Sequence, residues 1–257
     1  MKIHKKISIP VLTTCALITS LLSTFANAKP YGQVDYVRMQ KADSEPHNWL
    51  APGREQNGTY YSPLKTINDK NISKLGLAWT YNMGTLRGQE ATPIVVDGIM
   101  YTSGIWGRVY ALDATNGKEL WSFDPKVPGQ AARKACCDVV NRGVVVWQGK
   151  VYVAALDGKL YALNAATGKE LWKTDTIIDH KLPYASTGAP QIAKDVVVIG
   201  NSGSDMEKGG VRGYVTAYEL KTGKMKWRFF TVPGTPGTKP ENQEMEVAEK
   251  TWDPKRE

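Results

Sequence analysis

"ALDATNGKELW" at residues 111–121, "ALNAATGKELW" at 162–172 and "AYELKTGKMKW" at 217–227 align without a gap. Each copy carries a Gly-Lys pair in its second half and ends in tryptophan. Short apolar segments typical of β-strands precede the copies, as Val-Tyr-Val-Ala does at 151–154. An internal repeat of this kind predicts one supersecondary unit that is copied along the chain.

The repeat also predicts how each unit is built. Its glycine supplies the positive φ that a tight hairpin turn needs, and the acidic or amide residue four positions earlier can bond the turn backbone. The glycines are Gly117, Gly168 and Gly223, and the residues four positions before them are Asp113, Asn164 and Glu219. The terminal tryptophan suits a position between adjacent sheets, because its flat ring buries a large area while its N–H finds an acceptor.

The spacing of the tryptophans predicts the architecture. Trp121, Trp172 and Trp227 are 51 and 55 residues apart, which suits four short strands per unit, the blade of a β-propeller. Trp79 lies 42 residues before Trp121 and is interpreted as an earlier, degenerate copy. With 24 Gly, 14 Pro, 8 Trp and 12 Tyr, the composition agrees with a turn-rich all-β fold. A meandering β-sandwich is the alternative, and three ungapped copies of one pattern disfavour it.

Three clear units and a partial fourth predict roughly the first three to four blades of an incomplete propeller. The Pro-, Gly- and charge-rich tail at 232–257 is interpreted as a long connection between strands. We therefore expect the chain to be the N-terminal part of a larger protein.

The N-terminus has the layout of an export signal. Lys2, Lys5 and Lys6 precede an apolar run at 7–25, and the small-residue pattern Ala-Asn-Ala follows at 26–28. This pattern predicts a signal peptide over residues 1–28, cleavage after it, no permanent membrane span and a mature domain at 29–257 in the periplasm. Cys15 would leave with the signal, and the threonines before it disfavour a lipid anchor.

Charge and cysteine content narrow the possible partners. The formal net charge of +8 includes the three signal lysines, and no run of five or six basic residues indicates nucleic-acid binding. Cys136 and Cys137 remain after cleavage, in an oxidising compartment where a bonded state is the default. Being adjacent, they can bond only to each other, and such a pair is more often a functional device than a staple. Reduced thiols or a metal-binding pair are the alternatives, although only His47 and His180 accompany them in the mature chain.

The segments "EATPIVVDGIMYTS", "KACCDVVNRGVVVW", "TGAP" and "GVRGYVTAY" together resemble the quinoprotein alcohol dehydrogenases of the methanol and ethanol dehydrogenase type. The resemblance runs from about Tyr31 to the end of the chain. It implies an eight-bladed propeller that uses pyrroloquinoline quinone (PQQ) with a bound Ca²⁺ or lanthanide ion. The implied reaction is periplasmic oxidation of a small primary alcohol to an aldehyde, with electrons passed to a cytochrome c-type acceptor.

The resemblance assigns cofactor-binding roles to seven residues: Glu90, Cys136, Cys137, Arg142, Thr187, Gly203 and Ser204. In the family, a disulfide between the adjacent cysteines stacks on one face of the planar quinone, and an arginine and a glutamate contact the cofactor. A guanidinium suits carboxylates and quinone oxygens, a hydroxyl can bond a carboxylate, and a Gly-rich turn lets the backbone approach an anion. Without the family context, the arginine and the glutamate would read as solvated surface residues.

Asp205 matches the position of a family metal ligand, with Glu207 as the alternative in a shifted register. A carboxylate oxygen suits Ca²⁺ from either residue. No catalytic residue is assigned. The family's catalytic aspartate, a second metal ligand and the tryptophan beneath the quinone would lie C-terminal to Glu257.

Two other functions stay open at this point. A non-catalytic exported propeller that presents its surface to partner proteins would need neither the cysteine pair nor Arg142. A truncated product without activity of its own would keep every motif named above. Nicotinamide chemistry fits poorly, because "GNSGSD" at 200–205 is not a G-x-G-x-x-G motif between a strand and a helix.

Overall fold

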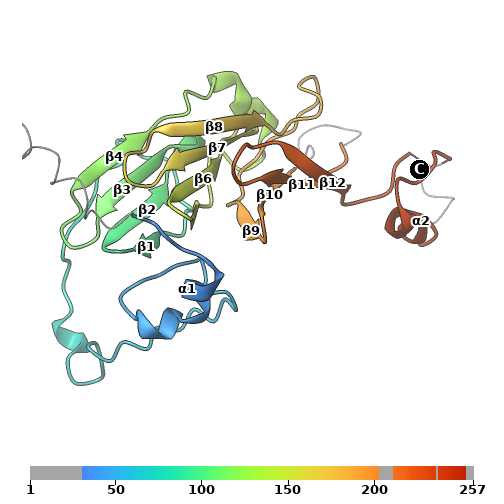
Figure 1. The fold of residues 1–257 in the computed structure, drawn as a ribbon. Helices are drawn as coiled ribbons and strands as arrows, with labels where there is room; N and C mark the ends of the chain where they lie inside the picture. The colour runs from blue at the N-terminus through green and yellow to red at the C-terminus, as the bar shows by residue number, and fades with distance from the viewer. Residues whose placement is uncertain (1–30, 203–210, 236, 253–257) are drawn as a thin grey trace, which may run out of the picture. The chain divides into compact units, whose positions relative to one another are not determined.

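In the computed structural model, residues 31–202, 211–235 and 237–252 are described. Within them, the strands form three antiparallel sheets of four strands each, and strands adjacent in the sequence are adjacent in the sheet (Figure 1). The first sheet contains β1 (Ile94–Val96), β2 (Ile99–Ser103), β3 (Val109–Asp113) and β4 (Glu119–Phe123). The second contains β5 (Val145–Trp147), β6 (Lys150–Ala154), β7 (Lys159–Asn164) and β8 (Glu170–Asp175). The third contains β9 (Gln191–Ala193), β10 (Val196–Asn201), β11 (Tyr214–Glu219) and β12 (Met225–Phe230). The prediction of four-stranded units is confirmed.

The sequence repeat forms the same piece of structure in every sheet. It begins in the third strand, crosses the turn and ends in the fourth strand. The alanine that opens each copy pairs with the tryptophan that closes it, and the register shifts directly after that pair. A bulge at a fixed place bends the strand and increases its twist. The repeat therefore specifies the shape of the sheet as well as its turn.

The turn glycines have the predicted left-handed conformation. Their φ values are 73° at Gly117, 70° at Gly168 and 70° at Gly223. The predicted bond from the residue four positions earlier is confirmed in two copies. Asp113 Oδ1 accepts the Thr115 N–H at 2.8 Å, and Asn164 Oδ1 accepts the Ala166 N–H at 2.9 Å. In the third copy the longer Glu219 side chain instead accepts a hydrogen bond from the Thr222 hydroxyl.

Trp121 and Trp172 of the repeat each pack against the turn glycine of the next sheet. The Trp121 ring lies so close to Gly168 that a Cβ there would be 2.5 Å from ring atom Cε3. Trp121 Nε1 also donates to the Ala165 carbonyl at 3.0 Å. Trp172 repeats the contact with Gly223 and donates to Leu220 O at 3.1 Å. The prediction of a tryptophan between sheets with a bonded N–H is confirmed.

The degenerate copy at Trp79 keeps this contact although it has lost its strand. Trp79 lies against Gly117, where a Cβ would be 2.5 Å from Cε3, and its Nε1 donates to the Ala114 carbonyl at 3.2 Å. Residues 76–82 form no strand in the described structure. Trp79 therefore keeps the contacts of the repeat tryptophan, although the backbone around it is not a strand.

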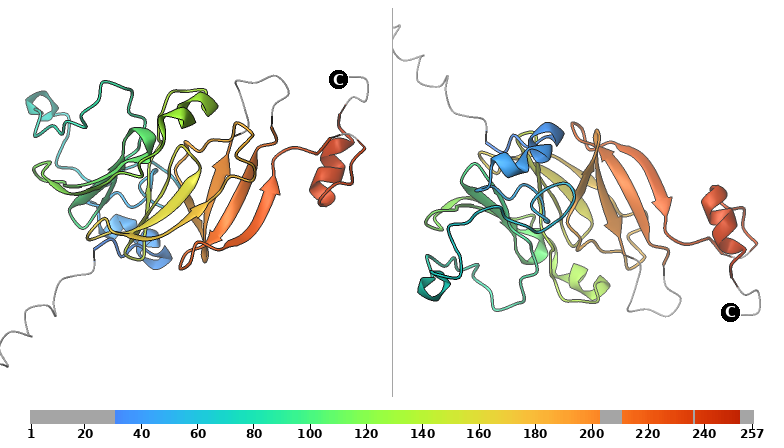
Figure 2. Two further views of the ribbon diagram at one scale, coloured as in Figure 1. Left: turned by 90° about the horizontal axis from the view of Figure 1, so that it is seen from above. Right: turned by 90° about the horizontal axis from the view of Figure 1, so that it is seen from below.

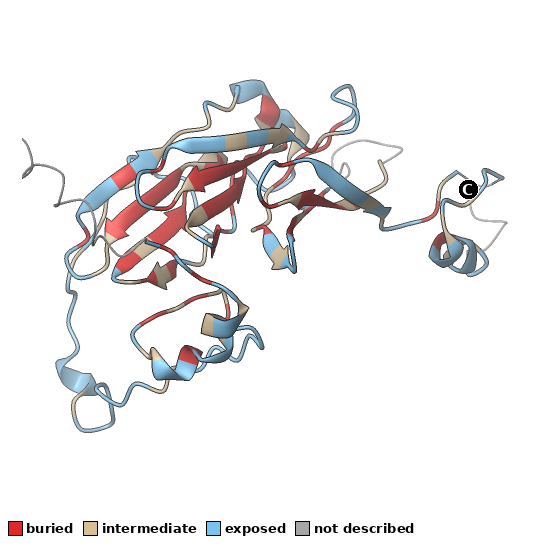
Figure 3. Ribbon diagram, in the orientation of Figure 1, coloured by how far each residue is buried: buried red, intermediate tan, exposed pale blue. Residues whose placement is uncertain are grey.

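Burial follows the position of a strand within its sheet. Figure 2 shows the three sheets side by side, and Figure 3 shows that the middle strands are mostly buried, whereas the fourth strands β4, β8 and β12 are mostly exposed. The outermost strand of the third sheet, β12, differs from its counterparts: Trp227 is 46% exposed, whereas Trp121 is 9% exposed. Met225 and Phe229 alternate with Trp227 along β12 and are exposed too. This face of the third sheet is apolar and uncovered in the described structure.

Short helices occupy the connections. They are α1 (Tyr36–Gln40), η1 (Ala42–Ser44), η2 (Ile72–Lys74), η3 (Ile105–Gly107), η4 (Gly129–Lys134) and α2 (Gln243–Glu249). The last of them falls in the tail that the sequence analysis interpreted only as a connection. Asn242 caps it by accepting a hydrogen bond from the Met245 N–H at 2.9 Å. The negative charges of Glu244 and Glu246 in its first turn interact favourably with the positive end of the helix dipole. Among the described residues, no helix combines the length and apolarity needed to cross a membrane.

An ion-pair network joins the N-terminal segment to the first sheet. Arg38 Nη2 lies 2.6 Å from both Glu45 Oε2 and Asp97 Oδ1, and Asp97 belongs to the β1–β2 turn. The hydrogen bonds from Arg38 hold the pKa of Glu45 below its ordinary value. Asn48 adds a bond to Glu45 Oε2 at 2.6 Å. This network anchors the segment that leads into the sheets.

We predict that Glu45→Gln lowers the free energy of unfolding at pH 7 by up to about 1 kcal/mol, since the pair is partly exposed. The contribution of a carboxyl with a lowered pKa is complete above its ordinary pKa of 4.5 and disappears as the pH falls through the lowered value. The difference between wild type and variant should therefore shrink as the pH falls below about 5. Urea titrations across this range measure it. A difference that stays constant with pH would contradict the prediction.

Candidate functional site

Three predicted site residues lie just before the first strands of the three successive sheets. Glu90 is four residues before β1, Arg142 is three before β5 and Thr187 is four before β9. Backbone bonds hold these entrances together: Arg142 N donates to Thr187 O at 2.9 Å, and Thr92 N donates to Arg142 O at 3.4 Å. Residues 45 positions apart in the sequence therefore meet because the repeat places equivalent segments side by side.

The side chains of these residues converge on Arg142. Its Nη1 donates to Thr187 Oγ1 at 2.5 Å, and its Nη2 lies 3.1 Å from Glu90 Oε2. The Arg142 and Glu90 side chains are 43% and 42% exposed, so a ligand in solution can reach both. Geometry thus brings together a cation, an anion and a hydroxyl contributed by three different sheet connections.

Cys136 and Cys137 are joined by a disulfide in the segment between β4 and β5. They follow η4 after Ala135, and both are exposed. No hydrogen bond or ion pair in the described structure links them to the Arg142 group. The following turn places Asp138 in the left-handed region, with φ of 62°. The cysteine pair thus lies on the same connection as Arg142 and is accessible to solvent.

A small apolar cluster supports the disulfide-bearing segment. Its buried members are Val139, Leu156 and Ala185, and the residues packed against them are Ile105, Trp106, Val127, Ala132 and Ala135. Trp106 also donates its backbone N–H to the Val139 carbonyl at 2.8 Å. The cluster combines residues from four connections, which fixes the cysteine pair on a packed base.

Asn141 is a buried residue that the sequence analysis left out of the site. It is 2% exposed, and its Oδ1 accepts bonds from Ser103 Oγ at 2.6 Å and from Gly143 N at 3.2 Å. Its Nδ2 donates to Ala154 O at 2.7 Å. With its amide bonded through both oxygen and nitrogen, Asn141 fixes the backbone from which Arg142 projects. An amide directly before a functional arginine was the available sequence signal.

A second ion pair was also missed. Arg87 and Asp138 form a hydrogen-bonded pair across 51 positions of sequence. Together with the pair between Glu90 and Arg142, it joins residues 87–90 to residues 138–142 by two ion pairs. Each segment contributes the cation to one pair and the anion to the other. Nothing in the local pattern of "LRGQE" indicates this partner, because the pairing depends on the fold.

The remaining predicted site residues lie outside the described part of the chain. They are Gly203, Ser204, Asp205 and the alternative ligand Glu207. Within the described ranges, no group of three or more His, Cys, Asp or Glu side chains is arranged to hold a metal ion. The assignments at 203–207 therefore stay predictions.

Comparison with known families and relatives gives consistent matches. The family model described as "PQQ: Glucose/ethanol/alcohol dehydrogenase, beta-propeller domain" matches residues 49–255. The chain is 53% identical over 238 residues to the quinohemoprotein alcohol dehydrogenase ADH-IIG of Pseudomonas putida, covering 92% of this chain and 33% of the relative. It is 50% identical over 206 residues to the 1-butanol dehydrogenase (cytochrome c) of Thauera butanivorans, covering 80% of this chain and 29% of that one.

Solved structures agree with these matches. The structure of ADH-IIG from P. putida superposes with a TM-score of 0.83 over 88% of this chain and 32% of the enzyme. A europium-containing methanol dehydrogenase gives a TM-score of 0.69 at 40% identity, over 77% of this chain and 34% of that enzyme. The chain therefore spans about a third of the length of the relatives it matches.

Proposed function

Because the chain belongs to the PQQ-dependent glucose, ethanol and alcohol dehydrogenase propeller family, we propose that its described site forms one side of a PQQ pocket. The observation that supports this proposal is the convergence of Glu90, Arg142 and Thr187 beside the segment that carries the Cys136–Cys137 disulfide. The predicted propeller fold is confirmed by the family match and by the superposition on ADH-IIG.

The chemistry of these residues fits PQQ. PQQ is planar and carries three carboxylates and an ortho-quinone. The Arg142 guanidinium, with five N–H donors, can bond carboxylate or quinone oxygens while keeping its present partners. The Thr187 hydroxyl can donate to a carboxylate, and Glu90 can accept a bond at the cofactor edge. The disulfide provides a flat surface of low polarity for stacking.

We propose a definite role for each side chain. Arg142 binds and orients an anionic edge, Thr187 fixes the arginine through its oxygen, and Glu90 limits the guanidinium to one orientation by pairing with its other nitrogen. When bound, PQQ would supply a two-electron acceptor for alcohol oxidation. Asp205, or Glu207, would hold Ca²⁺ or a lanthanide, and the Gly203–Ser204 backbone would approach the cofactor.

The activity of the family is proposed for the protein as a whole. It is oxidation of a primary alcohol to an aldehyde in the periplasm, with electrons passed to a cytochrome c-type acceptor. The names of the P. putida and T. butanivorans relatives support the substrate class and the acceptor. For the 257 residues themselves we expect cofactor binding without alcohol-dependent dye reduction, since no catalytic base is assigned in them.

We predict that Arg142→Met weakens PQQ binding by the 257-residue chain about tenfold, because a bond to a charged group is lost. Tryptophan fluorescence quenching on titration with PQQ, in the presence of Ca²⁺, measures the dissociation constant. The matched control is Arg108→Met, which removes the same charge from a different ion pair, with Asp124. Equal affinities for the two variants, or no binding by wild type, would contradict the proposed pocket.

A further inference from the structure

A cavity of about 250 Å³ separates the disulfide-bearing segment from the connection that leads to Thr187. Ala131 and Lys134 line it from η4, and His180 and Tyr184 line it from the other connection. Leu156, which is 1% exposed, lies at its base. The cavity lies between the two connections at these residues. Polar contacts across the gap therefore have more influence on their separation than they would in a packed core.

Lys134 makes such a contact. Its Nζ donates to the His180 carbonyl at 2.5 Å and to the Leu182 carbonyl at 3.2 Å, across 46 and 48 positions of sequence. The side chain starts two residues before Cys136. One ammonium group thus joins the segment of the cysteine pair to the connection that carries Thr187.

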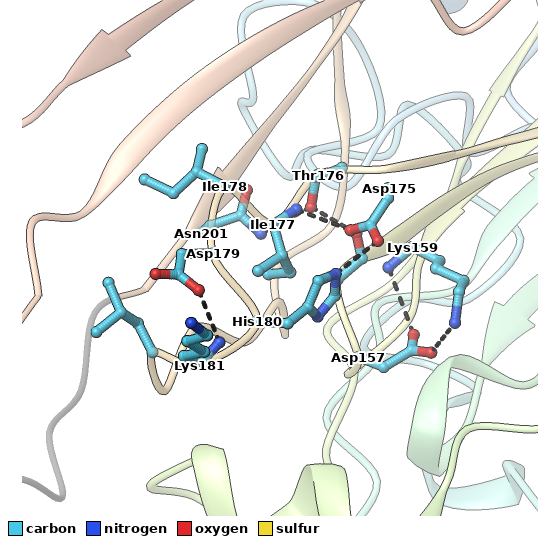
Figure 4. Close-up of polar contacts among 12 residues, drawn as sticks. Asp157, Lys159, Asp175, Thr176, Ile177, Ile178, Asp179, His180, Lys181 and Asn201 are labelled. Atoms are coloured by element: carbon cyan, nitrogen blue, oxygen red, sulfur yellow. Dashed lines mark hydrogen bonds and ion pairs between the residues drawn. The ribbon is translucent and has the colours of Figure 1, made fainter.

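The segment that accepts these bonds is itself anchored. His180 Nε2 lies 2.6 Å from Asp175 Oδ2, at the end of β8 (Figure 4). The Ile178 N–H donates to the Tyr214 hydroxyl of the third sheet at 3.2 Å. Lys134 therefore bonds to a connection that the second and third sheets already hold, so it can transmit their position to η4.

The other lysine of the cavity makes a different kind of contact. Lys159 Nζ pairs with Asp157 Oδ2 at 2.6 Å, within its own turn, as Figure 4 shows. Its bond spans two residues and joins no separate segments. Lys134 and Lys159 thus have the same charge and line the same cavity, and only Lys134 crosses it.

We propose that Lys134 is a positioning residue that sets the separation between the Cys136–Cys137 segment and the Thr187 connection. With the ammonium in place, η4 and residues 180–182 move as one unit. Without it, the two connections stay joined only by the Val139, Leu156 and Ala185 cluster and by the Arg142–Thr187 backbone bond, and the cysteine pair gains freedom to move relative to Thr187. The bracing stands on the geometry alone, whereas its effect on cofactor affinity rests on the proposed function.

Hydrogen exchange of the 257-residue chain tests the bracing directly. In Lys134→Met we expect exchange at the amides of Ala135, Leu182 and Tyr184 to accelerate roughly five- to tenfold, on both sides of the cavity. Lys134→Arg should restore near wild-type rates, because a guanidinium can also donate to both carbonyls. Lys159→Met is the matched control and should leave these amides unchanged.

Several results would overturn the inference. They are unchanged exchange at Leu182 in Lys134→Met, the same acceleration in Lys159→Met, or acceleration across all strands, which would indicate a general loss of stability. The second measurement is the PQQ dissociation constant, which should rise roughly fivefold in Lys134→Met and not in Lys159→Met. If wild type binds no PQQ, the proposed function fails, and the exchange rates still decide whether Lys134 braces the two connections.

Discussion

Trp121→Ala is expected to lower the free energy of unfolding by about 3–5 kcal/mol, the usual cost of removing a large buried aromatic side chain. The ring is 9% exposed, contacts Gly168 of the second sheet and donates its N–H to Ala165 O. Its removal leaves a cavity between two sheets and takes away one of the two donors to the Ala165 carbonyl, which keeps the Tyr101 hydroxyl. The loss is a large fraction of a typical domain stability. Urea unfolding followed by far-UV circular dichroism measures it.

Trp227→Ala is the matched control for this experiment. It removes the same side chain from the same position of the repeat, but this ring is 46% exposed and is not covered by another sheet in the described structure. We expect a smaller loss of about 1–2 kcal/mol, since about half of the side-chain area is already exposed to solvent. Similar losses for the two variants would show that contact between sheets is not what makes the repeat tryptophan stabilising.

Gly168→Ala should have the second large effect, a loss of roughly 3 kcal/mol from two separate causes. The residue has φ of 70°, which costs an alanine about 1–2 kcal/mol. The new Cβ would also lie 2.5 Å from Trp121 Cε3 and 2.7 Å from Cδ2, so the ring or the turn must shift. Overpacking of this kind typically costs about 1–3 kcal/mol.

Two other glycines separate these causes. Gly98 has φ of 80°, and a Cβ at this position would have no atom within 4 Å, so Gly98→Ala reports the backbone strain alone. Gly129 has neither a positive φ nor a neighbour within 4 Å, and Gly129→Ala should be close to neutral. The difference between Gly168→Ala and Gly98→Ala in thermal or urea unfolding gives the cost of the ring contact. No difference would contradict the packing argument.

The fold could be predicted from the sequence because its decisive contacts repeat. The tryptophan that packs on the glycine of the next copy stands at the same position in each copy. The sequence repeat therefore shows directly which residues pack against each other. For the candidate site, the family resemblance supplied the residues and the repeat explains why they lie close together, while their cofactor roles stay predictions. Glu90, Arg142 and Thr187 precede equivalent first strands, and equivalent positions of adjacent sheets meet in space.

The contacts that the sequence did not reveal are those without a repeating counterpart. Lys134 bonds to backbone carbonyls 46 and 48 positions away, and carbonyls have no sequence signature. The pairing of Arg87 with Asp138 depends on how two connections approach each other. Helix α2 is different, because its cap at Asn242 and its acidic first turn were visible in the sequence and were outweighed by the nearby Pro and Gly residues.

The docking of tryptophan on glycine gives the array of sheets a direction. Each ring packs on a glycine that comes later in the chain: Trp79 on Gly117, Trp121 on Gly168 and Trp172 on Gly223. Each of these three glycine turns is therefore already covered by a tryptophan ring, whereas the Trp227 ring is 46% exposed and covers no glycine turn among the described residues. The contact therefore propagates order in one direction only, from each sheet to the next.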